Sequence, residues 1–266
     1  MGSIEIRNMD PATEYFVGTC THVGDDPQAM TRDEIDVSSP RRIAWLRKMS
    51  RQGARTKVAT IEGEPVGFIH VIPIEICPWG PLGRDLLVIP CLVSLSNTKG
   101  RGVGKALVAT AEEEARHREK KGIVTVAYYH DCWFMPAPFF EECGFSLASR
   151  REGTALLWKL FDQSAEAPRL LERDYRYTPV PGKVVVDLFW NTFCPTSSIE
   201  ARRVRKVVEE FGESVVLNEY CADDREILLL HQLPRGIFVN GREIWWGHEA
   251  PEEGIRKAIL EASSRA

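Results

Sequence analysis

Residues 99–107 read Lys-Gly-Arg-Gly-Val-Gly-Lys-Ala-Leu, a glycine-rich loop that runs directly into a helical pattern. The apolar run at 86–95 before it predicts a strand, and the apolar residues from Val103 to Ala115 recur on one face of a helix. A strand, a glycine loop and a helix N-terminus in this order present unpaired N–H groups and the positive end of the helix dipole to an anion. Glycines let the backbone approach that anion without Cβ clashes. The sequence therefore predicts a site for a phosphorylated ligand.

Two common phosphate loops are excluded by counting. A Walker loop needs Gly and Ser or Thr where this chain has Lys99 and Ala106, which disfavours nucleoside-triphosphate hydrolysis. A dinucleotide fingerprint needs a third glycine where this chain has Lys105 or Leu107. The remaining pattern, Lys99-x-x-Gly102-x-Gly104, resembles the pyrophosphate loop of the Gcn5-related N-acetyltransferases (GNAT), although that family usually has Gln or Arg at the first position.

A second segment strengthens this resemblance. After the helix come a strand-like run at 123–129 and then Phe139-Phe140-Glu141-Glu142-Cys143-Gly144-Phe145, which resembles the family's short helix closing on Gly-Phe. The resemblance covers residues 1–162. It implies an α/β (α+β) fold with a mixed sheet, helices on both faces, and central strands that splay apart around the pantetheine arm. Pro90 is compatible with the irregular strand that such a splay needs.

The family resemblance also implies the cofactor and its site. Acetyl-CoA would be the cofactor, with its pantetheine amides paired to the backbone of Leu92, Val93 and Ser94. The residues expected around its pyrophosphate are Lys99, Gly100, Arg101, Gly102, Val103, Gly104 and Lys105.

Proton transfer is harder to assign, because Phe140 occupies the position where the family often has a tyrosine that protonates the leaving thiolate. Tyr129 could act as the acid instead, and His130 as acid or base, since imidazole titrates near neutrality. Glu75 could act as a base through water. A structural role for His130 and a polar strand face for Glu75 explain these residues equally well.

Composition limits the remaining classes. A length of 266 residues predicts two domains, and a net charge of −4 gives no basic field for nucleic acid. Nothing resembles a signal peptide or a membrane span. The seven cysteines, at irregular spacings, indicate free thiols in a reducing cytoplasm. Cys20-x-His22 and His130-x-Cys132 lack the usual spacing of zinc ligands, so we expect no metal site.

A linker is predicted at 163–182, where the regular pattern ends and prolines accumulate, and a second domain at 183–266. Its buried strand at 184–190 leads to Cys194-Pro195-Thr196-Ser197 and a helix. Amides at a helix start stabilise a thiolate, so Cys194 is a candidate reactive residue. Asn240-Gly241 predicts a hairpin, and a last helix carries Ile255, Ala258 and Ile259.

The resulting order βαβαββα, with Cys-x-x-Ser at the first helix, resembles the thioredoxin fold. That resemblance implies a cis Pro234 facing Cys194. Ser197 replaces the resolving cysteine, and Cys221 is the nearest in sequence that could substitute. A module kept only for docking or dimerisation is an equal alternative.

Together the two halves resemble the YoaP-type bacterial acetyltransferases. The sequence therefore predicts a cytoplasmic acetyl-CoA-dependent N-acyltransferase that acts on a primary amine of a small molecule or a protein, with no nucleic-acid or membrane partner. A thiol-active oxidoreductase with a CoA-binding regulatory domain is the alternative, and a non-catalytic adaptor is a third. The acceptor, the acid and base, and the oligomeric state, including a homodimer, stay open.

Overall fold

The computed structural model describes residues 2–20, 31–130, 134–244 and 250–264. The chain forms two compact units, residues 1–21 with 46–171 and residues 22–45 with 172–266. Residues 163–171 thus accompany the first unit, and residues 22–45, which the sequence placed in the first domain, accompany the second. Helix α2 (Arg32–Ser50) crosses this division. No helix among the described residues is long and apolar enough to cross a membrane.

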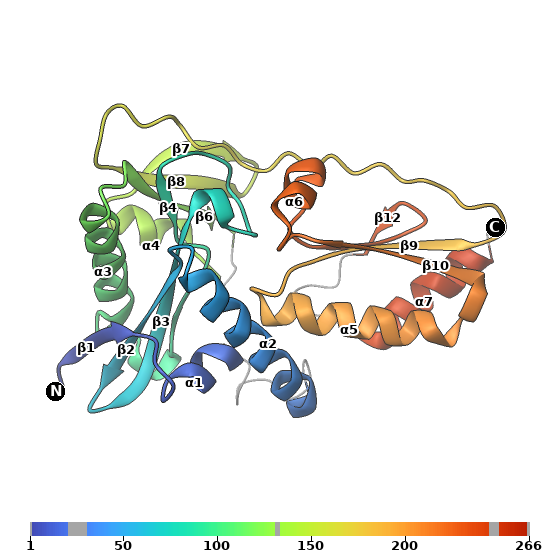
Figure 1. The fold of residues 1–266 in the computed structure, drawn as a ribbon, viewed down its shortest axis with the longest axis horizontal. Helices are drawn as coiled ribbons and strands as arrows, with labels where there is room; N and C mark the ends of the chain where they lie inside the picture. The colour runs from blue at the N-terminus through green and yellow to red at the C-terminus, as the bar shows by residue number, and fades with distance from the viewer. Residues whose placement is uncertain (1, 21–30, 131–133, 245–249, 265–266) are drawn as a thin grey trace. The chain divides into compact units, whose positions relative to one another are not determined.

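Figure 1 shows the elements in chain order. Besides part of α2, the first unit contains β1 (Ile4–Asn8), α1 (Glu14–Thr19), β2 (Arg55–Ile61), β3 (Glu64–Pro73), η1 (Ile74–Ile76), β4 (Leu86–Val88), β5 (Leu92–Ser94), η2 (Ser96–Thr98), α3 (Val103–His117), β6 (Gly122–Tyr128), α4 (Ala137–Glu142), β7 (Ser146–Arg151) and β8 (Thr154–Leu160). The second contains β9 (Val184–Trp190), α5 (Pro195–Glu210), η3 (Gly212–Ser214), β10 (Val215–Cys221), α6 (Arg225–His231), β11 (Gly236–Val239), β12 (Arg242–Glu243) and α7 (Glu252–Ser263).

The first unit is built on an eight-stranded mixed sheet in the order β1-β2-β3-β4-β6-β8-β7, with β5 paired to β3. Among the described strands of this sheet, β4 and β6 are the pair that runs parallel. Helices α3 and α4 pack on one face of the sheet through a shared apolar core. On the other face Phe16 of α1 meets the ring of Phe68 edge-on, with centroids 5.8 Å apart. The mixed sheet with helices on both faces agrees with the sequence prediction.

The predicted strand at 86–95 is divided in two by one extra residue. Ile72 of β3 faces Val88 of β4, and Ile69 faces Leu92 of β5, so three steps on β3 correspond to four on the other strand. The extra residue lies in the segment around Pro90, where a bulge removes the need for a ladder N–H that proline lacks. Beyond this bulge β5 pairs with β3 alone, so the sheet opens between β5 and β6.

The predicted face of helix α3 is confirmed, because Val103, Leu107, Ala111 and Ala115 are all buried in the core. The helix begins after Gly102, which has a left-handed φ of +82°. Glycine adopts this conformation without the steric cost that other residues incur.

The second unit has the predicted order βαβαββα, with strands arranged β10-β9-β11-β12. β9 and β10 are parallel, and β11 is antiparallel to β9. Alternate residues of β9 face two cores: Val184, Val186 and Leu188 pack with α5 and α7. Phe189 packs on the opposite face with Leu233, Phe238, Tyr175 and Tyr220. Both faces of this central strand are therefore covered.

The hairpin and the linker of this unit can be compared with the sequence prediction. Asn240 and Gly241 both have positive φ and join β11 to β12, as a two-residue hairpin requires. The residues predicted as its linker contain no helix or strand, but Tyr175 stacks on Phe238 with ring centroids 4.0 Å apart. Its hydroxyl donates to Asp187 at 2.7 Å. The second half of the linker is thus packed onto the sheet.

Candidate active site

The loop before α3 leaves several backbone donors unused. Among the described residues, the N–H groups of Gly100, Gly102, Val103, Gly104 and Lys105 have no hydrogen-bond acceptor, and the first helical bond runs from Ala106 N to Gly102 O at 3.0 Å. These groups converge at the positive end of the helix dipole, which is the arrangement that binds anions.

Arg101 differs from its neighbours, because its N–H donates to Thr98 O at 3.0 Å. Its backbone is therefore not available to a ligand in this conformation. The Lys99 and Arg101 side chains are both exposed beside the loop and add positive charge there.

The two sequence motifs meet at the start of α3. A Cβ on Gly104 would lie 3.1 Å from Cζ of Phe139 on α4, so a larger residue there would press against the Phe139 ring. Lys105 Nζ also forms an ion pair with Glu142 Oε2 at 3.1 Å across the same contact. The Lys105 side chain is therefore paired with α4, whereas its backbone N–H has no acceptor among the described residues.

The outer edge of β5 borders the opening in the sheet. In its antiparallel pair with β3, the bonds from His70 N to Cys91 O and from Leu95 N to Val66 O fix which residues face β3. By the alternation of such ladders, the backbone of Val93 faces β3, and the backbones of Leu92 and Ser94 face outward. Two of the three residues predicted to pair with a ligand therefore have outward-facing N–H and C=O groups.

Tyr129 and His130 follow β6, which runs parallel to β4, so they lie at the end of the sheet towards which β4 and β5 lead. The Tyr129 hydroxyl donates to Glu141 Oε1 of α4, and the Arg150 guanidinium lies 4.4 Å from the ring centroid. This hydrogen bond, with a smaller contribution from burial, raises the pKa of Tyr129. His130 is exposed and packs against Tyr128, 5.1 Å between ring centroids.

Glu75 is not brought to this end of the sheet. It lies in η1 rather than on the predicted strand face, and its carboxylate accepts the Asp85 N–H at 2.8 Å. Asp85 precedes β4, whereas β5 and the glycine loop follow it. The seven steps along the chain from Asp85 to Leu92 span roughly 20 Å when extended. Phe140, at the family's usual tyrosine position, is fully buried in the core.

His70 was missed by the sequence analysis. It is fully buried on β3, its Nδ1 lies 2.8 Å from Thr56 Oγ1, and its backbone N–H reaches Cys91 O beside the bulge. It lies on the sheet face opposite α3, with Phe68. Thr125 lies on β6, on the other side of the opening between β5 and β6. Its hydroxyl donates to Ile89 O at 2.8 Å. This position of His70 could not be predicted from the sequence. A single histidine within an apolar run does not indicate which residues of the neighbouring strands lie beside it.

In the second unit, the Cys-x-x-Ser segment is organised by Asn191, which is fully buried. Asn191 Oδ1 accepts the Cys194 N–H at 2.9 Å, and its Nδ2 donates to Pro234 O at 2.9 Å. Its own N–H donates to the Ser197 hydroxyl at 3.0 Å. Cys194 is half-buried, so the side chain has access to solvent. The prediction of a cis Pro234 is wrong: the described cis bond is Gly80-Pro81.

Among the residues that the structure describes, no group of three or more His, Cys, Asp or Glu side chains could hold a metal ion. His22 and Cys132 of the weighed zinc site lie outside that part of the chain.

Residues 52–147 match the family model described as an acetyltransferase (GNAT) domain. No curated protein matches the chain. Solved structures with a similar fold include a ribosomal-protein-alanine N-acetyltransferase from Brucella melitensis, which is 21% identical, covers 59% of this chain and 99% of its own, and has a TM-score of 0.45. The PaiA N-acetyltransferase of Thermoplasma acidophilum in complex with coenzyme A is 14% identical, with coverages of 60% and 99% and a TM-score of 0.44. The family model covers less than half of the chain, and these structural likenesses are distant.

Proposed function

We propose that the GNAT acetyltransferase domain matched at residues 52–147 transfers an acetyl group from acetyl-CoA to a primary amine. The observation that carries this proposal is the set of unused N–H groups at the start of α3, next to the open edge of β5. One ligand fits both features: a pyrophosphate needs the N–H groups, and an amide-bearing arm needs the strand edge.

The pyrophosphate would accept from the N–H groups of Gly100, Gly102, Val103, Gly104 and Lys105, with Lys99 and Arg101 adding charge. The amides of the pantetheine arm would pair with the outward-facing backbone of Leu92 and Ser94. Val93 would hold β5 against β3 rather than contact the cofactor. The thioester would then lie towards the bulge at Pro90.

Acyl transfer requires that the amine lose a proton, that the oxyanion be stabilised and that the thiolate be protonated. Tyr129 and His130 are the proposed proton carriers, because Phe140 has no proton to donate. The Tyr129 hydroxyl donates a hydrogen bond to Glu141 in this structure, so acid catalysis by Tyr129 requires that hydrogen bond to break. His130, which is exposed, has no such requirement.

We propose further that residues 183–266 form a thioredoxin-like module, as in YoaP-type acetyltransferases. Its element order, its parallel β9–β10 pair and its antiparallel β11 and β12 support this assignment. Cys194 at the start of α5 could exchange with an external disulfide, forming a mixed disulfide and releasing one thiolate. Since the described cysteines are all free thiols, we propose a cytoplasmic location.

Cofactor binding and turnover test the main proposal separately. Isothermal titration of the full chain with acetyl-CoA should give saturable binding, and a panel of amino acids, polyamines and peptides should reveal acetylated products by mass spectrometry. Binding without turnover on a broad panel would favour the regulatory alternative, in which the first unit only binds CoA. Absence of acetyl-CoA binding would overturn the proposal.

A further inference from the structure

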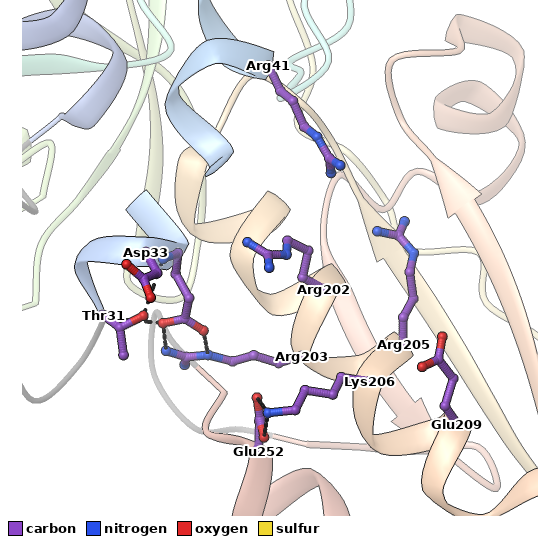
Figure 2. A pocket seen from close by; sticks show the side chains of 10 residues that line it. Thr31, Asp33, Arg41, Arg202, Arg203, Arg205, Lys206, Glu209 and Glu252 are labelled. Carbon is purple, nitrogen blue, oxygen red and sulfur yellow. Dashed lines mark hydrogen bonds and ion pairs between the residues drawn. The ribbon is translucent and has the colours of Figure 1, made fainter. Parts of the chain in front are cut away.

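The second unit contains a cavity of about 510 Å³, lined by the start of α2, by α5 and by the start of α7 (Figure 2). Small-molecule sites commonly enclose about 300–1,000 Å³. The cavity differs from most such sites in its charge. Its lining includes five cationic side chains, namely Arg41, Arg202, Arg203, Arg205 and Lys206.

Three of these cations already form ion pairs with carboxylates. Arg203 binds both carboxylate oxygens of Glu34, at 2.6 and 2.8 Å, and Arg205 binds Glu219 at 2.6 and 2.8 Å. Lys206 pairs with Glu252 at 2.7 Å. These pairs connect neighbouring elements and need no ligand.

Arg41 and Arg202 differ, because neither has a hydrogen-bond or ion-pair partner among the described residues. Nη1 of Arg202 is moreover buried from solvent without an acceptor. A buried donor without a partner is costly, and native proteins seldom leave one unless a ligand, ion or water satisfies it. The Arg202 guanidinium is therefore the feature of this cavity that calls for an anion.

Three guanidinium groups line the same part of the cavity. Arg202 and Arg205 are one helical turn apart on α5, and Arg41 extends towards them from α2 (Figure 2). A guanidinium offers a planar fork of donors that matches phosphate oxygens, and hydrogen bonds between opposite charges are about twice as strong as neutral ones.

The acidic side chains of the lining limit the ligand's size. Asp33 and Glu209 are exposed, and Figure 2 shows them on opposite sides of the lining, Asp33 beside Thr31 and Glu209 below Arg205. They would repel a long polyanion that covered the whole surface. The positive part of the lining is therefore suited to one compact anionic group.

We propose that this cavity binds a phosphorylated small molecule, with its phosphate held by Arg41 and Arg202. The site lies within the second unit and uses none of the residues assigned to acetyl-CoA. It adds a second ligand to the chain, independent of acetyl transfer.

Inorganic phosphate is the probe for the first test, with the full chain titrated calorimetrically. Arg202→Gln and Arg41→Gln should each weaken phosphate binding by about tenfold or more, the scale of one lost charge-assisted hydrogen bond. Arg256→Gln is the matched control, because Arg256 pairs with Glu210 and does not line the cavity. It should change phosphate affinity less than about twofold. Wild-type phosphate affinity in both test variants would overturn the proposal.

Thermal unfolding gives a second readout. At the same phosphate concentration, the Tm of the wild type should rise more than that of Arg202→Gln. Without phosphate, Arg202→Gln should unfold at the wild-type temperature or above it, since it removes a cation with a buried nitrogen that has no acceptor. A lower Tm without phosphate would show that Arg202 has a structural partner, which contradicts the proposal.

The glycine loop of the first unit could also attract phosphate, so the titration is repeated in Gly102→Val. Phosphate binding that persists there, and is lost on adding Arg202→Gln, supports the cavity. Loss of phosphate binding in Gly102→Val alone would place the anion at the loop and overturn the proposal. Acetate that binds as tightly as phosphate would make the cavity a carboxylate site instead, which also contradicts it.

Discussion

Gly102 and Gly63 have nearly the same backbone conformation, with φ of +82° and +85°, and neither has an atom within 4 Å of a Cβ position. Valine at either position therefore introduces the same kind of backbone strain. Only at Gly102 would the side chain occupy the space in front of the α3 amides.

This pair gives a controlled test of the cofactor site. Gly102→Val should weaken acetyl-CoA binding by about 3 kcal/mol, the scale of one or two hydrogen bonds to a charged group. Gly63→Val should bind acetyl-CoA like the wild type in the same titration. Equal affinity in both variants would show that the loop is only a turn.

The hydroxyl of Tyr129 provides a prediction about proton transfer. Tyr129→Phe and His130→Ala should each be made, and loss of the true acid or base should lower kcat by roughly a hundredfold or more. Because Glu141 raises the pKa of Tyr129, Glu141→Gln should lower that pKa. If Tyr129 is the acid, the alkaline limb of the pH–rate profile should then shift to lower pH. Full activity in both single variants would leave solvent as the proton carrier.

Cys194 should react faster than the buried cysteines. It is half-buried at a helix start, whereas Cys77 and Cys91 are 0% and 7% exposed. Brief alkylation near neutral pH followed by peptide mapping should find Cys194 modified before either buried thiol. A Cys194 that reacts no faster than Cys91 would make the second unit a scaffold.

At the scale of elements, α2 and α5 are joined by an ion pair as well as by apolar contacts. Burial alone would raise the pKa of Glu34, but its hydrogen bonds from Arg203 and from Thr31 outweigh burial and hold that pKa below its usual value of 4.5. A carboxylate with a lowered folded-state pKa stabilises the fold above pH 4.5, and this contribution disappears as the pH falls through the lowered value.

Glu34→Gln should therefore destabilise the protein at pH 7 by about 2 kcal/mol, because it removes the carboxylate that neutralises the charge of the largely buried Arg203. Urea unfolding should show the difference from wild type shrinking as the pH is lowered from 6 to 3. Glu210→Gln, which removes the exposed pair with Arg256, should have little effect at any pH. A difference that stays constant with pH would mean that the Glu34 charge does not contribute.

Elements whose signals are local could be predicted from the sequence. The glycine loop, the buried face of α3 and the Asn240-Gly241 hairpin each depend on residues close together in the chain. The bulge at Pro90 could be predicted as an irregularity, but not its register. The outward direction of Leu92 and Ser94 depends on which residue of β3 lies opposite, and the role of Asn191 depends on Pro234, 43 residues away.

At the scale of the whole molecule, the sequence did not indicate where residues 22–45 belong. Helix α2 contains Pro40 in its interior and buries Ser38, Ser39 and Arg42, so it lacks a continuous apolar stripe. Ile35 of this helix packs against Ile199, and Trp45 packs against Phe193. Both partners come more than 140 residues later in the chain. No local pattern carries that information.

The assignment of residues 22–45 to the second unit has a consequence for synthesis. The ribosome releases this segment before its partners on α5 exist, and at about 5–20 residues per second the delay is on the order of ten seconds. During that interval Ile35 and Trp45 have no apolar surface of their own unit to cover them, so nascent chains are open to chaperone capture at this point. For the same reason, an expression fragment that stops after the first unit would retain half of an interface, and neither unit can be transplanted into another protein as one uninterrupted segment.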